Sequence, residues 1–74
     1  MNTKEFINYL KMEDSNFVKG LLEKANLPKQ MNDIMFLKCI KFYKDKDIEN
    51  TLHLTKDQIS FRVRKACIKI NKLH

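Results

Sequence analysis

One C-terminal stretch constrains the fold of this chain more than any other: residues 55–73, which read TKDQISFRVRKACIKINKL. It opens on a Thr-x-x-Gln capping box. The hydroxyl of Thr55 can accept from the backbone N–H of Gln58, and the amide of Gln58 can return a bond to the N–H of Thr55. Apolar residues then recur at helical spacing: Ile59, Val63, Ala66 and Ile70. The pattern predicts a long helix that buries this face.

The opposite face of this predicted helix is polar and largely cationic. It carries Asp57, Ser60, Phe61, Arg64 and Lys65, with Lys69 and Lys72 near its edge. A helix that is apolar behind and basic in front can pack on a small core and enter a DNA groove. Phe61 and Ile68 stand out because they are apolar residues on the face expected to be exposed. Ile68 in particular indicates that part of this face meets protein.

The rest of the chain predicts shorter helices and few tight turns, since it contains one Gly and one Pro. Apolar spacing and capping residues predict helices over residues 3–11, 17–25, 28–42 and 45–52. We expect Phe17 to face the core, Pro28 to lie in the first turn of the third helix, and Asp45 to cap the fourth. Gly20 weakens the second helix by about 1 kcal/mol relative to Ala, unless it permits close packing.

We therefore expect a compact all-α domain of four to five helices with a C-terminal helix-turn-helix. Residues 1–26 form a helical pair that packs on the core, and residues 27–74 contain the helix-turn-helix. A short helix, a three-residue link and a longer capped helix have the proportions of that motif.

Charge is distributed unevenly along the chain. Through Asp33, five lysines balance five acidic residues, whereas ten basic and four acidic side chains follow from Ile34 onward and give the whole net charge of +6. A neutral part beside a basic part indicates a polyanionic partner for the C-terminal region. The alternative is that the lysines are solvated surface residues, as is common in proteins from AT-rich bacterial and phage genomes.

Several functional classes lack support in the sequence. Cys39 and Cys67 are single and far apart, so small buried hydrophobic roles are expected, and His53 and His74 do not combine with them into metal-ligand spacing. No catalytic constellation and no Gly-rich phosphate loop is present, so we expect neither an enzyme nor a cofactor. The apolar runs are far below the ~18 residues of a membrane span, which leads us to expect a cytoplasmic protein.

An ungapped series of residues carries a family resemblance. It comprises Leu27-Pro28, the apolar Ile34 and Leu37, the acidic-Ile pair Asp47-Ile48, the turn Leu54-Thr55, and then Ile59, Arg62, Lys65 and Ala66. In this order and spacing the chain resembles region 4 of bacterial RNA polymerase sigma factors, especially the short extracytoplasmic-function type. It is also similar, with one gap, to LuxR-type regulators, which share the helix-turn-helix. Residues 1–20 lie outside the resemblance.

Three positions depart from the family pattern. Glu49 stands where the family has a small Ala that lets the two helices approach, while Phe42 and His53 stand where it has Gly. These departures leave open the angle at which the two helices cross.

The resemblance also implies DNA-binding residues, because in the family the start of the second helix reads the promoter −35 element. Carried over by position, this role falls on Lys56, Asp57, Ser60, Phe61 and Lys65, with Arg64 beside them. The basic groups can hold phosphates or guanine, Asp57 can accept from a cytosine amine, and the Phe61 ring can contact a thymine methyl. Thr55 and Gln58 can touch a phosphate at the helix N-terminus, although capping alone explains them. Further phosphate contacts are expected from Lys41, Lys44, Lys46 and Lys69.

These observations lead to one expected function and one alternative. The first is a bacterial or phage transcription regulator that binds double-stranded DNA and, because so small a module binds weakly alone, also dimerises or contacts RNA polymerase. The alternative is a phage or mobile-element interaction module that binds RNA polymerase or another protein through Phe61 and Ile68. Arg62, at the edge of the apolar face, is expected to extend over the core or to pair with Glu49 rather than to read a base.

Overall fold

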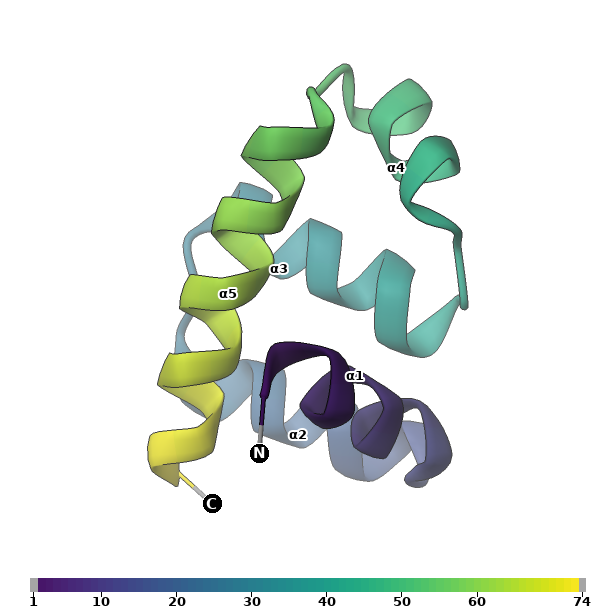
Figure 1. Cartoon of the computed structure of the whole chain (residues 1–74). Helices are drawn as coiled ribbons and strands as arrows, with labels where there is room; N and C mark the ends of the chain where they lie inside the picture. Colours follow the sequence, from purple (N-terminus) through teal and green to yellow (C-terminus); the bar gives the residue numbers. More distant parts are fainter. Residues whose placement is uncertain (1, 74) are drawn as a thin grey trace.

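The computed structural model describes residues 2–73 (Figure 1). The elements in chain order are α1 (Thr3–Met12), α2 (Ser15–Ala25), α3 (Lys29–Met35) with its π-helical continuation η1 (Phe36–Ile40), α4 (Asp45–Leu52) and α5 (Lys56–Leu73). No strand occurs within residues 2–73. The expected all-α fold with a C-terminal helix-turn-helix is therefore confirmed.

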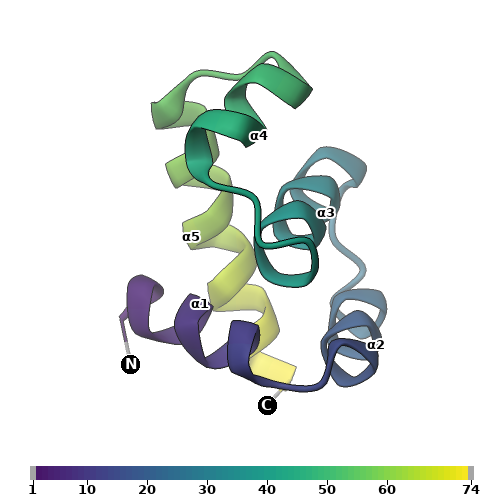
Figure 2. The same cartoon turned by 90° about the vertical axis from the view of Figure 1, so that its right-hand side faces the viewer.

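The helices are arranged around α5, which runs most of the length of the molecule. The pair α1 and α2 lies at one end, α4 lies at the other, and α3 with η1 occupies the middle (Figures 1 and 2). The overall extents are 29 × 22 × 19 Å.

One apolar core unites all the helices. Its most deeply buried side chains are Leu10, Val18, Ile34, Met35, Ile48, Ile59 and Ile70. Because α1 and α2 contribute to the same cluster as the C-terminal helices, the N-terminal pair packs directly on the core. Each fully buried aliphatic side chain contributes about 1.5–3 kcal/mol, so this shared cluster is what holds so short a chain together.

Side-chain caps fix where three of the helices begin. Asn2 Oδ1 accepts from the Glu5 N–H at 2.8 Å, and Asp14 Oδ1 accepts from the Asn16 N–H at 3.1 Å. Both bonds of the capping box form: the Thr55 N–H donates to Gln58 Oε1 at 2.9 Å, and the Gln58 N–H donates to Thr55 Oγ1 at 3.2 Å. The sequence prediction of this cap is confirmed.

Two local expectations about side chains were wrong. Phe17 was expected in the core but is 42% exposed, because Val18 and Leu21 present the buried face of α2. Asp45 does not cap α4: Lys44 occupies the capping position, and the Asp45 carboxylate instead pairs with Lys38.

The third helix also differs from its expected bounds. Pro28 stands at its capping position rather than in its first turn, and the helix ends at Ile40 instead of continuing to residue 42. The cause is the wider π turn, in which the Lys41 N–H donates to the Phe36 carbonyl. The chain can then reverse direction before α4 begins.

Three non-glycine residues adopt left-handed backbone conformations where helices end. These are Asn26 (φ 51°), Phe42 (φ 59°) and His53 (φ 57°). Asn tolerates this region because its short polar side chain can bond locally, but Phe and His are strained there by about 1–2 kcal/mol. The packed core on either side therefore holds both turns in an unfavourable conformation.

Gly20 serves no close packing, because a Cβ built on it meets no atom within 4 Å. Within residues 2–73, none of the helices combines the length and the hydropathy that a membrane crossing requires.

Candidate nucleic-acid interface

The candidate interface is built on α4, a three-residue turn and α5. The turn begins at His53, whose N–H donates to the Glu49 carbonyl, and its left-handed conformation lets the next N–H, that of Leu54, donate to the same carbonyl at 3.1 Å. Leu52 and Leu54 are half-buried against the core, so the turn is anchored from both sides. These contacts fix the direction in which α5 leaves α4.

The helix α5 separates sharply into two faces. Its inner face consists of Ile59, Val63, Ala66, Cys67 and Ile70, each no more than 5% exposed. Its outer face presents Lys56, Asp57, Ser60, Phe61, Arg64 and Lys65, all exposed. The burial predicted from the apolar periodicity is therefore confirmed, and these six residues, all expected to contact DNA, share one accessible surface.

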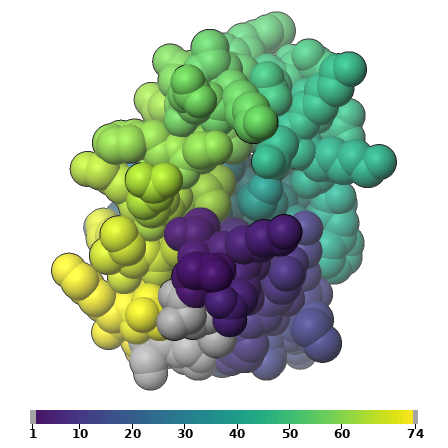
Figure 3. All heavy atoms as spheres, in the orientation of Figure 1, coloured from purple at the N-terminus to yellow at the C-terminus, as the bar shows by residue number. Residues whose placement is uncertain are grey.

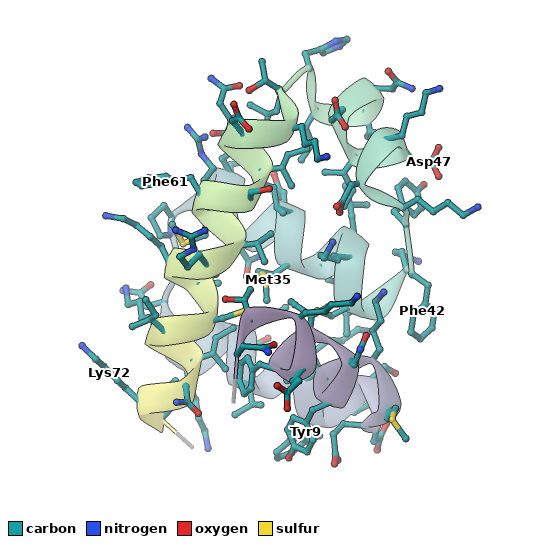
Figure 4. The ribbon with its side chains drawn as sticks, viewed as in Figure 1. Tyr9, Met35, Phe42, Asp47, Phe61 and Lys72 are labelled. Atoms are coloured by element: carbon teal, nitrogen blue, oxygen red, sulfur yellow. The ribbon has the colours of Figure 1, made fainter. Side chains whose placement is uncertain are left out.

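Phe61 and Lys65 form a pair on this outer face. The Lys65 Nζ lies 4.9 Å from the centroid of the Phe61 ring, within the range of a cation–π contact. The ring is 55% exposed and points away from the body of the protein (Figure 4). Because Lys65 holds the ring on one side, the pair presents an aromatic surface and a positive charge together.

Ile68 lies one heptad beyond Phe61 and is 54% exposed. Asn2, Thr3 and Phe6 line a small hollow together with Ile68, so the start of α1 lies beside it. About half of the Ile68 side chain stays accessible beside this hollow.

Two basic residues of α5 lie apart from the outer face. The Lys69 Nζ donates to the Asn26 carbonyl at 3.3 Å, which places a positive charge at the C-terminal end of α2, where the helix dipole favours it. Arg62 is half-buried and donates to the Gln58 carbonyl at 3.3 Å rather than forming an ion pair with Glu49. The structure thus separates Lys69 from the other predicted DNA-binding residues.

The remaining predicted phosphate contacts surround the start of α4. Lys44 and Lys46 are exposed, and the Lys41 Nζ lies 5.8 Å from the centroid of the Phe36 ring. Asp45 and Asp47 alternate with these lysines in the first turn of α4. The local net charge is consequently smaller than the lysines alone would give.

The structure adds α1 to this surface, which the sequence analysis did not. Lys4, Asn8 and Lys11 lie on the side of α1 that faces Ser60 and Arg64 of α5. Their spacing of four and three residues was visible in the sequence as one helical face. Nothing in the sequence indicated that this face would lie beside α5, because that depends on how α1 packs.

The two cysteines lie in the core and are not placed for chemistry. Burial raises the pKa of Cys39 to about 11, although the nearby charges of Lys11 and Lys38 partly oppose the shift. Burial also raises the pKa of Cys67 to about 12, and Cys39 adds to that rise. Both thiols therefore stay protonated at neutral pH and act as small apolar residues, as expected.

Metal binding finds no support in residues 2–73, where no three His, Cys, Asp or Glu side chains gather in one place. His74, which the sequence analysis had considered, lies outside the described residues.

Comparison with known proteins gives no match: no family model, no curated protein and no solved structure is significantly similar to this chain.

Proposed function

We propose that this protein is a DNA-binding transcriptional regulator that uses α4, the turn and α5 as a sigma region 4-like helix-turn-helix. The observation that carries the proposal is the division of α5 into a buried apolar face and an exposed cationic face. A capped helix presented in this way has the size and charge to enter a major groove. Such a role implies a cytoplasmic protein.

The backbone at two turns supports the resemblance on which the proposal draws. Phe42 and His53 occupy positions where the family has Gly, and both adopt the positive φ angles that Gly tolerates best. The chain thus keeps the turn geometry although it lacks the residue that normally permits it. Glu49 stands where the family has a small Ala; it lies within α4, and its side chain is half-buried.

The side chains of the outer face divide into two roles. Lys56, Arg64 and Lys65 supply positive charge for phosphates or for guanine edges, and Ser60 can donate to either. Phe61 supplies an apolar surface for a thymine methyl. Asp57, which no cation pairs within residues 2–73, can accept from a cytosine amine and would repel a phosphate, so it favours base contacts at that position.

A pair of charge-matched variants tests the proposal. Fluorescence anisotropy with random and promoter-like duplexes, at about 50 to 200 mM salt, should show affinity falling steeply with salt. Lys65→Ala should lower the slope of log affinity against log salt by about 0.9, while Lys24→Ala, which removes the same charge from α2, should leave it unchanged. Absence of binding to any duplex at about 50 mM salt would contradict the proposal.

A second function is favoured by a separate observation, namely that Phe61 and Ile68 are exposed at heptad spacing. These residues suit contact with a second copy of the chain, with RNA polymerase or with another protein. If this is the main function, Ile68→Ala should abolish binding to RNA polymerase or lower the sedimentation mass, whereas Lys65→Ala should change neither. A regulator that binds DNA and also contacts RNA polymerase would combine both functions. In that case Lys65→Ala should weaken only the binding of duplex DNA, and Ile68→Ala should weaken only the binding of protein.

A further inference from the structure

A groove lies between α1 and α5 and is closed at one end by the junction of η1 with α4. Its volume is about 460 Å³, within the range of sites that hold small ligands. Figure 3 shows the hollow where the surfaces of α1, α4 and α5 meet. Ile7, Ile59 and Val63 form its apolar floor, and each is at most 5% exposed.

The rim of the groove is strongly cationic. Lys4 and Lys11 project from α1, Arg64 from α5 and Lys38 from η1, while Asp45 is the one acidic residue in the lining. Asp45 pairs with Lys38, and these two charges neutralise each other.

The other three cations have no acidic partner in the described part of the chain. Within residues 2–73 the ion pairs are Lys29–Asp33 and Lys38–Asp45, so Lys4, Lys11 and Arg64 remain unpaired around one hollow. Like charges brought together in this way repel one another, and a bound anion would relieve the repulsion. Asn8 and Ser60 add uncharged hydrogen-bonding groups between the cations.

We propose that this groove is a phosphate-binding site. Three cations and two neutral polar groups over an apolar floor match a phosphate ester, which offers negative oxygens beside a less polar sugar. Ser60 and Arg64 belong both to this groove and to the outer face of α5, so a bound phosphate would lie directly beside the proposed reading surface. If the protein binds DNA as proposed, the groove holds the sugar-phosphate backbone at the edge of the major groove, and α1 becomes part of the interface.

Two sources share this chemistry, the backbone of a duplex and a free polyphosphate. The test compares Lys4→Gln/Lys11→Gln with Lys19→Gln/Lys24→Gln, which removes two lysines from α2. Gln keeps the helix propensity of Lys in each case. Thermal unfolding checks that all proteins are folded. Each protein is titrated with tripolyphosphate by calorimetry and with duplex DNA by anisotropy.

The groove variant should bind tripolyphosphate about tenfold more weakly than the wild type, as expected for the loss of two solvent-accessible ion pairs, and the α2 variant should bind like the wild type. With duplex DNA, the slope of log affinity against log salt should be smaller by about 1.8 for the groove variant than for the wild type, because two phosphate contacts are lost. Its affinity should therefore fall about tenfold less than that of the wild type between about 50 and 200 mM salt.

The outcomes distinguish this inference from the proposed function. A tripolyphosphate effect without any duplex binding would uphold the groove as a phosphate site and reject DNA binding. Normal duplex binding with identical behaviour of the two double variants would reject the groove and keep the proposed function. If the wild type bound neither ligand, both would be rejected.

Discussion

Replacing Phe42 and His53 by glycine is expected to stabilise this protein. Both residues hold positive φ angles, 59° and 57°, which cost a side chain with a Cβ about 1–2 kcal/mol each. Glycine removes that strain, but its greater conformational freedom stabilises the unfolded state by about 0.4–1 kcal/mol at each site. The Phe42 ring is 61% exposed, so its removal sacrifices little buried area.

The balance is a gain of about 0.5–1 kcal/mol at each position. The double variant should therefore be more stable by about 1–2 kcal/mol, which raises the melting temperature of a domain of this size by about 4–16 °C. Because the chain has no Trp, far-ultraviolet circular dichroism in urea and on heating is the appropriate assay.

The double alanine variant at the same positions is the matched control. It removes the same side chains but keeps the Cβ atoms, so the backbone strain persists and no gain is expected. Equal stability of the glycine and alanine variants would refute the argument that these turns are strained.

Three further predictions follow from local features. Gly20→Ala should raise the free energy of unfolding by about 1 kcal/mol, because alanine favours the helix and the added methyl meets no neighbour. Lys19→Gly in the same helix should lower the free energy of unfolding by a similar amount, and urea midpoints measure both changes. Thr55→Ala should lower stability by about 1 kcal/mol in the same assay, since the Gln58 N–H loses its acceptor; an unchanged midpoint would show that the cap is dispensable. Stability should also fall as pH rises from about 9 toward 11 and 12, because the thiols of Cys39 and Cys67 ionise more readily when unfolded than when folded. A Cys→Ala double variant should lose less stability over that range; an identical pH profile would contradict this.

The sequence predicted the helices well where capping and periodicity agreed. Both signals marked the start of α5, and the structure contains both capping bonds and the buried apolar face. The sequence predicted the buried side chains of a helix less well where periodicity was the one signal present. Phe17 fits the apolar periodicity of α2, yet Val18 and Leu21 complete the buried face without it.

The candidate site was predictable only in part. The outer face of α5 follows from helical geometry, since residues opposite a buried face must face solvent. The groove depends on how α1 packs against α5, and no local pattern in either helix determines that packing. Lys69 shows the same limit, because its contact with Asn26 joins residues 43 positions apart.

The surface of the protein that meets nucleic acid can be located by following the amide chemical shifts of isotope-labelled protein during titration with duplex DNA. Salt-sensitive shifts should concentrate in the first turns of α5, from Lys56 to Lys65, and beside Lys4 and Lys11 of α1. Shifts confined to α2, or none at about 50 mM salt, would contradict the claim that α5 presents its cationic face to nucleic acid.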